Sequence, residues 1–195
     1  MTDPAVLERA AAGPRRRDAV LRREALLNAA IECFDTHGYS VSLEDIADHA
    51  GVGRGTFYRN FKDRPALILA IFAREIEKIA DDDQDGLSLE ESMRAMVLRG
   101  ARVGALFDRM AVESQLTREQ LAGFRALGAR VEELMTPMLE RAQAAGRLRS
   151  DMTPADMMVA VRMLGGLCKP LNSPSEIDAY LDAGLSLLLR GMAPR

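Results

Sequence analysis

The sequence predicts an all-α chain of two parts with about nine helices, because its helix-start and helix-stop signals are frequent. Apolar residues recur at intervals of three and four along most of the 195 residues. No alternation of apolar and polar residues, as a strand would need, lasts more than a few positions. An acidic, polar stretch over 81–87 interrupts the helical pattern, so we expect a linker there and a helical domain over 88–195.

The first helices follow from local signals in the first third of the chain. Residues 18–37 carry an apolar stripe that ends at Gly38, where a left-handed residue would stop the helix. Residues 1–17 lack a clear face and are expected to form a flexible basic arm. After a domain over 18–63, proline in its first turn opens a connecting helix over 64–80.

The later helices are expected over 88–103, 106–113, 118–145, 154–168 and 174–190. Serine or threonine precedes three of these ranges, serine begins the first range, and proline begins two of them. The acids of the linker could bind a cation, but a solvated loop is the more common role of such a run.

Basic residues are concentrated in one stretch, although the chain as a whole is acidic. The chain carries a net charge of −3, with 48% apolar and 28% charged residues, which is typical of a globular protein. Residues 1–62 hold nine basic and nine acidic side chains, but residues 9–23 hold six arginines and one acid. Because charges more than about 8 Å away are screened at physiological salt, this stretch can attract phosphate despite the acidic total.

Several classes of protein are disfavoured. Cys33 and Cys168 are far apart and in no metal-ligand spacing, which fits a reducing cytoplasm and no disulfide framework. No apolar run approaches the length that spans a membrane. The two histidines, His37 and His49, are interpreted as local structural residues. With no catalytic or cofactor-binding motif, we expect a cytoplasmic protein without a cofactor that is not an enzyme.

The stretch 42–62 carries the strongest functional signal. Ser42 and Asp45 have the spacing of a capping box, and a glycine turn at 51–53 separates two short apolar-striped helices. In the second helix, expected over 54–62, Phe57 and Phe61 share one face and Arg59 points the opposite way. The outer face has small, hydroxyl and basic groups and no acid, which suits the major groove of DNA. The alternative is a solvated surface helix.

Residues 22–72 resemble the DNA-binding signature of the tetracycline-repressor (TetR) family of bacterial transcriptional regulators. The resemblance rests on AAIECF, the DIADHAGV run and TFYRNF. Asn60 stands where the family commonly has histidine or tyrosine, and Arg64 stands where it commonly has lysine. The segment GRLRSDMTPADM also resembles an inter-helix loop of the family.

The motif predicts a division of labour on DNA. Thr56 and Arg59 are expected to face base edges, and Ser42, Tyr58, Lys62 and Arg64 to hold phosphates. The complete set of expected DNA-binding residues is Ser42, Arg54, Gly55, Thr56, Tyr58, Arg59, Lys62 and Arg64.

Two helices near the C-terminus are too apolar to be buried on one side. Most of the helix circumference is apolar in both segments, ADMMVAVRMLGGLC and YLDAGLSLLL, which predicts a homodimer interface. The family resemblance implies the same pair of helices. The expected interface residues are Met158, Val161, Gly165, Leu181, Leu185 and Leu188. The alternative is that these side chains are buried within one subunit.

The middle helices are the expected place for a small apolar effector. Flexible methionines can refill an irregular cavity, although a methionine-rich stripe is more often plain core. The candidate lining residues are Met93, Met96, Phe107, Met110, Phe124, Leu127, Met135, Met138 and Met158.

Taken together, the motif and the resemblance predict a homodimeric DNA-binding repressor with a near-palindromic operator and release by a small molecule. Two alternatives stay open: a helical scaffold whose basic segment binds protein or RNA, and a DNA-binding regulator without an effector.

Overall fold

The computed structural model describes residues 14–81, 87–113, 116–168 and 173–194, which contain eight helices and no strand. The all-α prediction is therefore confirmed for the described part of the chain. The chain divides between Leu67 and Ile68 into two compact units. The acidic linker predicted over 81–87 falls mostly on residues 82–86, which lie outside the described residues.

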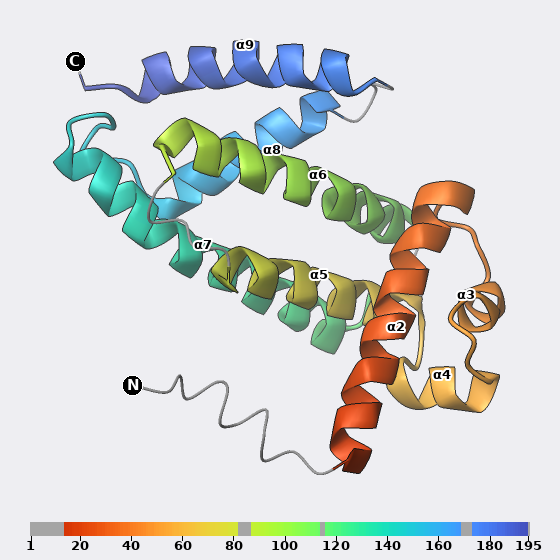
Figure 1. The fold of residues 1–195 in the computed structure, drawn as a ribbon. Helices are drawn as coiled ribbons and strands as arrows, with labels where there is room; N and C mark the ends of the chain where they lie inside the picture. The colour runs from red at the N-terminus through yellow and green to blue at the C-terminus, as the bar shows by residue number, and fades with distance from the viewer. Residues whose placement is uncertain (1–13, 82–86, 114–115, 169–172, 195) are drawn as a thin grey trace. The chain divides into compact units, whose positions relative to one another are not determined.

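The N-terminal unit contains α2 (Pro14–His37), α3 (Leu43–His49), α4 (Arg54–Asn60) and the first turn of α5 (Arg64–Asp81). Figure 1 shows α3 and α4 on one side of α2. Helix α2 starts four residues before the predicted position, so the end of the expected basic arm is helical instead. Proline is favoured in a first turn and arginine is a good helix former, which explains the earlier start. The rest of the arm, residues 1–13, lies outside the described part.

The core of the N-terminal unit is built from the apolar stripes of its helices. Gly38 ends α2 with φ of 79°, a left-handed conformation that glycine adopts without a Cβ penalty. Asp63 Oδ1 accepts the Ala66 backbone N–H (2.7 Å) and caps the start of α5. The largest fully buried side chains of this unit are Leu26, Leu27, Ile46, Phe57, Phe61 and Leu67.

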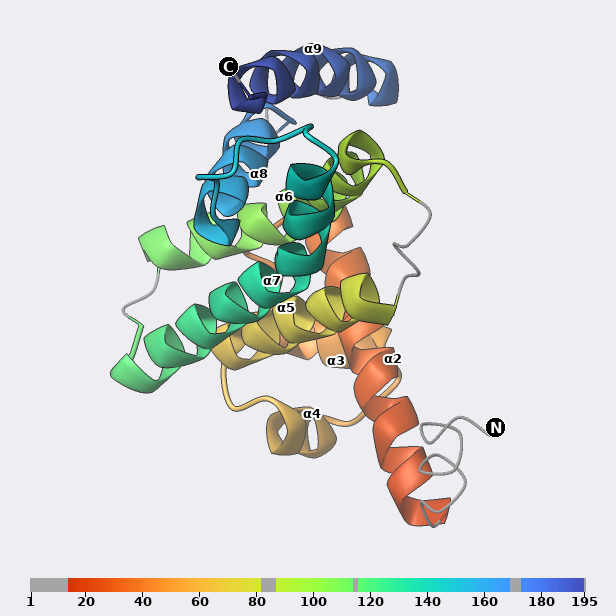
Figure 2. The same cartoon turned by 90° about the vertical axis from the view of Figure 1, so that its left-hand side faces the viewer.

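The C-terminal unit contains the rest of α5, then α6 (Leu89–Glu113), α7 (Arg118–Ala144), α8 (Pro154–Cys168) and α9 (Pro174–Met192). Helix α8 packs against α6, α7 and α9, and α9 also packs against α6. Both views show α9 lying over α8 at one end of this unit (Figures 1 and 2). An ion pair supports that arrangement, because Arg94 of α6 contacts Asp178 (3.1 Å) and Asp182 of α9.

The prediction of two helices over 88–103 and 106–113 is wrong, since α6 runs through both without a break. Gly104 lies inside this helix, where glycine costs about 1 kcal/mol relative to alanine. A single glycine does not remove a hydrogen bond as proline would, and the flanking stretch is otherwise rich in good helix formers. The penalty is therefore too small to end the helix.

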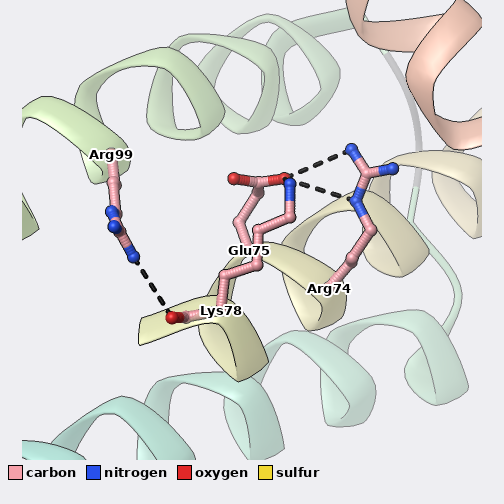
Figure 3. A network of polar contacts seen from close by, with 4 residues as sticks. All are labelled: Arg74, Glu75, Lys78 and Arg99. Carbon is pink, nitrogen blue, oxygen red and sulfur yellow. Dashed lines mark hydrogen bonds and ion pairs between the residues drawn. The ribbon is translucent and has the colours of Figure 1, made fainter. Parts of the chain in front are cut away.

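A polar network joins α5 to α6 inside the C-terminal unit (Figure 3). Glu75 Oε1 accepts from Lys78 Nζ (2.9 Å) and from Arg74 Nη2 (3.2 Å). Burial alone would raise the pKa of Glu75, but the contact with Lys78 and the charge of Arg74 hold it below its usual value. Arg99 of α6 donates to the Lys78 carbonyl oxygen (3.3 Å), so it satisfies a carbonyl near the C-terminal end of α5.

Candidate nucleic-acid interface

The first helix of the motif begins with the predicted cap. The Ser42 hydroxyl accepts the backbone N–H of Asp45 (3.0 Å) and donates to Asp45 Oδ2 (2.6 Å). The hydroxyl hydrogen is therefore already committed within the cap. A phosphate contact at Ser42 that left the cap intact would have to use the backbone N–H, not the side-chain hydrogen.

The turn and the second helix follow the predicted order, but the helix is shorter. Gly51 has φ of 66°, and Gly53 is the N-cap of α4. Helix α4 ends at Asn60 rather than Lys62, and Phe61 after it is extended, with φ of −139°. The Asn60 side-chain amide donates to the Thr56 carbonyl oxygen (2.8 Å), which satisfies a carbonyl of the last turn. The sequence did not reveal this role of Asn60.

Two aromatic anchors hold α4 against its own unit. Phe57 and Phe61 are 0% and 1% exposed, and their ring centroids lie 5.9 Å apart in an edge-to-face arrangement. The Arg23 guanidinium of α2 lies 4.7 Å from the centroid of the Phe61 ring, a cation–π contact. The inward face of α4 is therefore fixed, as predicted, and its orientation on the unit is set.

The outward face of α4 presents most of the residues that the sequence assigned to DNA. Thr56 is half-buried, and the Arg59 guanidinium donates to its hydroxyl oxygen (3.0 Å). A Cβ added at Gly55 would meet nothing within 4 Å, so the backbone there is open to close approach. The exposed members of the set are Arg54, Gly55, Tyr58, Arg59 and Lys62.

An acidic side chain that sequence reasoning missed touches this surface from the neighbouring helix. The Tyr58 hydroxyl donates to Glu44 Oε1 of α3 (2.9 Å). This hydrogen bond lowers the pKa of Glu44 and raises the pKa of Tyr58, so the carboxylate and the neutral phenol are both favoured. Sequence reasoning missed Glu44 because this residue belongs to α3, and the helical wheel of α4 alone contains no acid.

Arg64 does not lie where a phosphate-binding side chain is expected. Its guanidinium donates to the backbone carbonyl oxygens of Tyr39 and Val41 (2.7 Å to Val41) and lies 5.0 Å from the centroid of the Tyr39 ring. The side chain is half-buried and ties the loop after α2 to the start of α5. In this geometry Arg64 has a structural role, so we propose that it is not among the DNA contacts.

Replacing Arg64 with methionine should therefore destabilise the protein rather than weaken a phosphate contact. Two half-buried carbonyl groups would lose charged donors, which costs about 2–4 kcal/mol of the free energy of unfolding. Urea denaturation followed by circular dichroism measures this loss. Arg64→Lys keeps the charge but lacks the planar guanidinium that donates to both carbonyl groups, so it should also be destabilised. If Arg64→Lys and Arg64→Met were both as stable as the wild-type protein, the structural role of Arg64 would be contradicted.

A side-chain contact also joins α3 to α2. His49 Nε2 lies 2.9 Å from Glu32 Oε2, and both side chains are exposed. This agrees with the interpretation of His49 as a local structural residue. His37 is the last residue of α2 and is exposed.

Most of the methionines predicted to line the effector pocket lie in the core of the C-terminal unit. Met93, Met96, Met110 and Met135 are at most 4% exposed, which favours the plain-core interpretation for these side chains. Leu127 and Met158 are half-buried, and Met138 belongs to the same core. A surface hollow of about 440 Å³ is lined by Arg149, Ser150, Asp151 and Pro194, none of which was predicted.

Two of the predicted residues form part of an aromatic cluster. Phe107 of α6 and Phe124 of α7 are half-buried and lie 5.1 Å apart between ring centroids. Phe72 of α5 packs edge-on against both, at 6.2 and 5.7 Å. Three helices thus bring partly exposed rings together, which a stripe on one helix could not show.

The predicted dimer residues lie on the inward faces of α8 and α9. Val161, Leu181 and Leu185 are 8%, 1% and 0% exposed and belong to the core of this unit. A Cβ on Gly165 would lie 3.9 Å from the Ala101 Cα, so this glycine allows α6 and α8 to approach each other. Met158 and Leu188 also pack against the same core. Within one subunit Val161, Gly165, Leu181 and Leu185 are buried, whereas Met158 and Leu188 are half-buried, so the packing favours the alternative for four of the six and an interface through this set stays a prediction.

The opposite faces of the same two helices are apolar and open. Val159 and Met163, one turn apart on α8, are 56% and 59% exposed. Tyr180 and Leu187, two turns apart on α9, are 52% and 66% exposed. The sequence therefore identified the right helices as having apolar surface to spare, but it chose their inward residues.

No helix among the described residues is long and apolar enough to cross a membrane. Within the same ranges, no group of three or more histidine, cysteine, aspartate or glutamate side chains is placed to hold a metal ion.

Comparisons with known proteins agree with the motif and extend beyond it. Residues 26–71 match the family model described as bacterial regulatory proteins, tetR family. Residues 86–194 match the model described as transcriptional regulator SbtR-like, C-terminal domain. This second match covers more than half of the chain.

Relatives and solved structures point the same way. The chain is 26% identical over 182 residues to the HTH-type transcriptional repressor Rv1474c of Mycobacterium tuberculosis, covering 83% of this chain and 89% of that protein. It is 26% identical over 163 residues to the HTH-type transcriptional repressor AcnR of Corynebacterium diphtheriae, covering 81% and 85%. The TetR transcriptional regulator SCO0520 from Streptomyces coelicolor superposes with a TM-score of 0.62 at 28% identity, over 88% of this chain and 98% of that one. The chain belongs to the TetR family of DNA-binding transcriptional regulators, which are not enzymes.

Proposed function

We propose that this protein is a homodimeric transcriptional repressor, acting in the cytoplasm, that binds a near-palindromic operator and is released by a small apolar effector. The observation that carries the proposal is the outward face of α4. This face exposes Arg54, Gly55, Tyr58 and Arg59, whereas Phe57 within the helix and Phe61 directly after it are buried. A rigid helix with hydrogen-bond donors and an open glycine on one face fits the major groove.

Repression rather than activation is supported by Rv1474c and AcnR, two relatives that are both named as repressors. The homodimer is supported by the open apolar faces of α8 and α9, which carry Val159, Met163, Tyr180 and Leu187. A helix as short as α4 reads only a few base pairs, so two half-sites related by a two-fold axis are needed for useful specificity.

The effector is proposed to bind at the aromatic cluster of the C-terminal unit. The half-buried rings of Phe72, Phe107 and Phe124 bring apolar groups of α5, α6 and α7 together, where an apolar ligand could contact them. A regulator without an effector remains the competing hypothesis. Release of a labelled operator by apolar compounds, and loss of that release in Phe124→Ala, would separate the two.

Selection of bound fragments from genomic DNA tests DNA recognition directly. We expect enrichment of one near-palindromic sequence, with half-site centres separated by about one helical turn or somewhat more. We also expect the purified protein to lower transcription from a promoter that carries this sequence. Equal retention of all duplexes, or stronger retention of single-stranded RNA, would favour the scaffold hypothesis instead.

A further inference from the structure

The contact between Glu44 and Tyr58 places a carboxylate beside side chains that we assign to DNA. Glu44 lies in the first turn of α3, and Tyr58 lies on the flank of α4, 44% exposed. The single hydrogen of the Tyr58 hydroxyl is donated to Glu44 Oε1 at 2.9 Å. Because a phenol has one donor, Tyr58 cannot donate to a phosphate without first giving up Glu44.

The ring of Tyr58 is also held in place. Its centroid lies 5.6 Å from that of the buried Phe57 in an edge-to-face arrangement. Glu44 therefore fixes the hydroxyl of Tyr58, and Phe57 fixes its ring. The Arg54 charge favours the ionised form of Glu44, which strengthens the acceptor.

We propose that Glu44 is a positioning residue that limits the affinity for the operator by holding the Tyr58 hydroxyl, which must leave Glu44 before it can donate to a phosphate. This inference rests on the proposed function. On an arbitrary duplex, a phosphate must compete with a well-placed carboxylate for the hydroxyl hydrogen, and the exchange brings no gain. On the operator, base contacts from α4 fix the register, so a phosphate is held at the position where the exchange is favourable.

The experiment compares binding of the selected operator with binding of a scrambled duplex of the same length and composition. Glu44→Ala removes the acceptor, so the operator no longer displaces a hydrogen bond and we expect it to bind about fivefold more tightly, the size of one net hydrogen bond. Binding of scrambled DNA should change by less than about twofold, because it offers the Tyr58 hydroxyl no phosphate in register. The ratio of the operator affinity to the scrambled-DNA affinity therefore rises. Glu44→Gln keeps an acceptor oxygen and should preserve most of the ratio.

Two controls separate this role from a simple charge effect. Asp48→Asn removes the same charge one turn further along α3, where the side chain is exposed. It should strengthen binding to both duplexes alike and leave the ratio unchanged. In a Tyr58→Phe background, Glu44→Ala should no longer raise the ratio, because there is no hydroxyl to release. Thermal melts check that all variants are folded.

The outcomes distinguish this inference from the proposed function. If wild-type protein prefers its operator but Glu44→Ala leaves the ratio unchanged, or changes it equally in the Tyr58→Phe background, the role of Glu44 is wrong and DNA recognition stands. A higher ratio in Asp48→Asn, equal to that in Glu44→Ala, would likewise reduce the effect to charge. If wild-type protein does not distinguish the two duplexes, the proposed function fails and this inference with it.

Discussion

Arg59→Ala is expected to weaken operator binding by about 1–3 kcal/mol, or roughly 5- to 150-fold, and to relax base preference at one position of each half-site. The Arg59 guanidinium is exposed, lies opposite the buried Phe57 and Phe61, and is held by the Thr56 hydroxyl at 3.0 Å. A guanidinium held in this way can form the bidentate contact with guanine that is common in the major groove. Quantitative binding to a library of single-base operator variants measures both effects.

Lys62→Ala provides the comparison for Arg59→Ala. Lys62 is exposed just beyond the end of α4, where we assign it to a phosphate. Its loss should weaken all duplexes alike and reduce the slope of log affinity against log salt by about one. If both variants showed the same profile of base preferences, the division between base-reading and phosphate-binding residues would be refuted.

Features set by neighbouring residues in the chain could be predicted from the sequence. Thr117 caps α7 with the reciprocal bonds of a capping box, and Ser173 caps α9 just before a proline. Gly38 and Gly146 have positive φ, as expected where a helix ends. These signals act over one turn of helix, so a single sequence carries them completely.

Helix boundaries were predicted less well where two weak local preferences compete. A break was predicted between residues 103 and 106, but α6 continues because Gly104 in this gap removes no hydrogen bond. Helix α4 was expected to reach Lys62, yet Asn60 takes up a carbonyl of the last turn and Phe61 becomes extended. In both cases the outcome depends on differences of about 1 kcal/mol or less.

The candidate sites show the larger gap, because they depend on contacts between distant parts of the chain. Arg64 was assigned to phosphate on its type and position, but carbonyls 23 and 25 residues away hold it. The Glu44–Tyr58 contact joins two helices whose separate patterns give no sign of it. A helix that is apolar all round, such as α8, has no pattern that tells which face is inward.

Leu187→Asp is expected to produce a folded monomer that binds the operator at least about 100-fold more weakly, since the gain from joining two half-sites is typically 10²–10⁴. Leu187 is 66% exposed on the outward face of α9, in line with Tyr180, so its charge remains solvated in the isolated subunit. In a dimer it would be buried without a partner, which is unfavourable. Sedimentation velocity beside an operator-shift assay measures both consequences.

Leu185→Asp, two residues earlier on the same helix, is the matched control and should behave differently. Leu185 is 0% exposed in the core formed with α6 and α8, so a carboxylate there loses its hydration and leaves a cavity. We expect the free energy of unfolding to fall by at least about 3 kcal/mol, with loss of soluble, folded protein. The contrast assigns the interface to one face of α9, because the two changes add the same charge about 200° apart around one helix. A Leu187→Asp protein that remains dimeric and binds its operator normally would place the interface elsewhere.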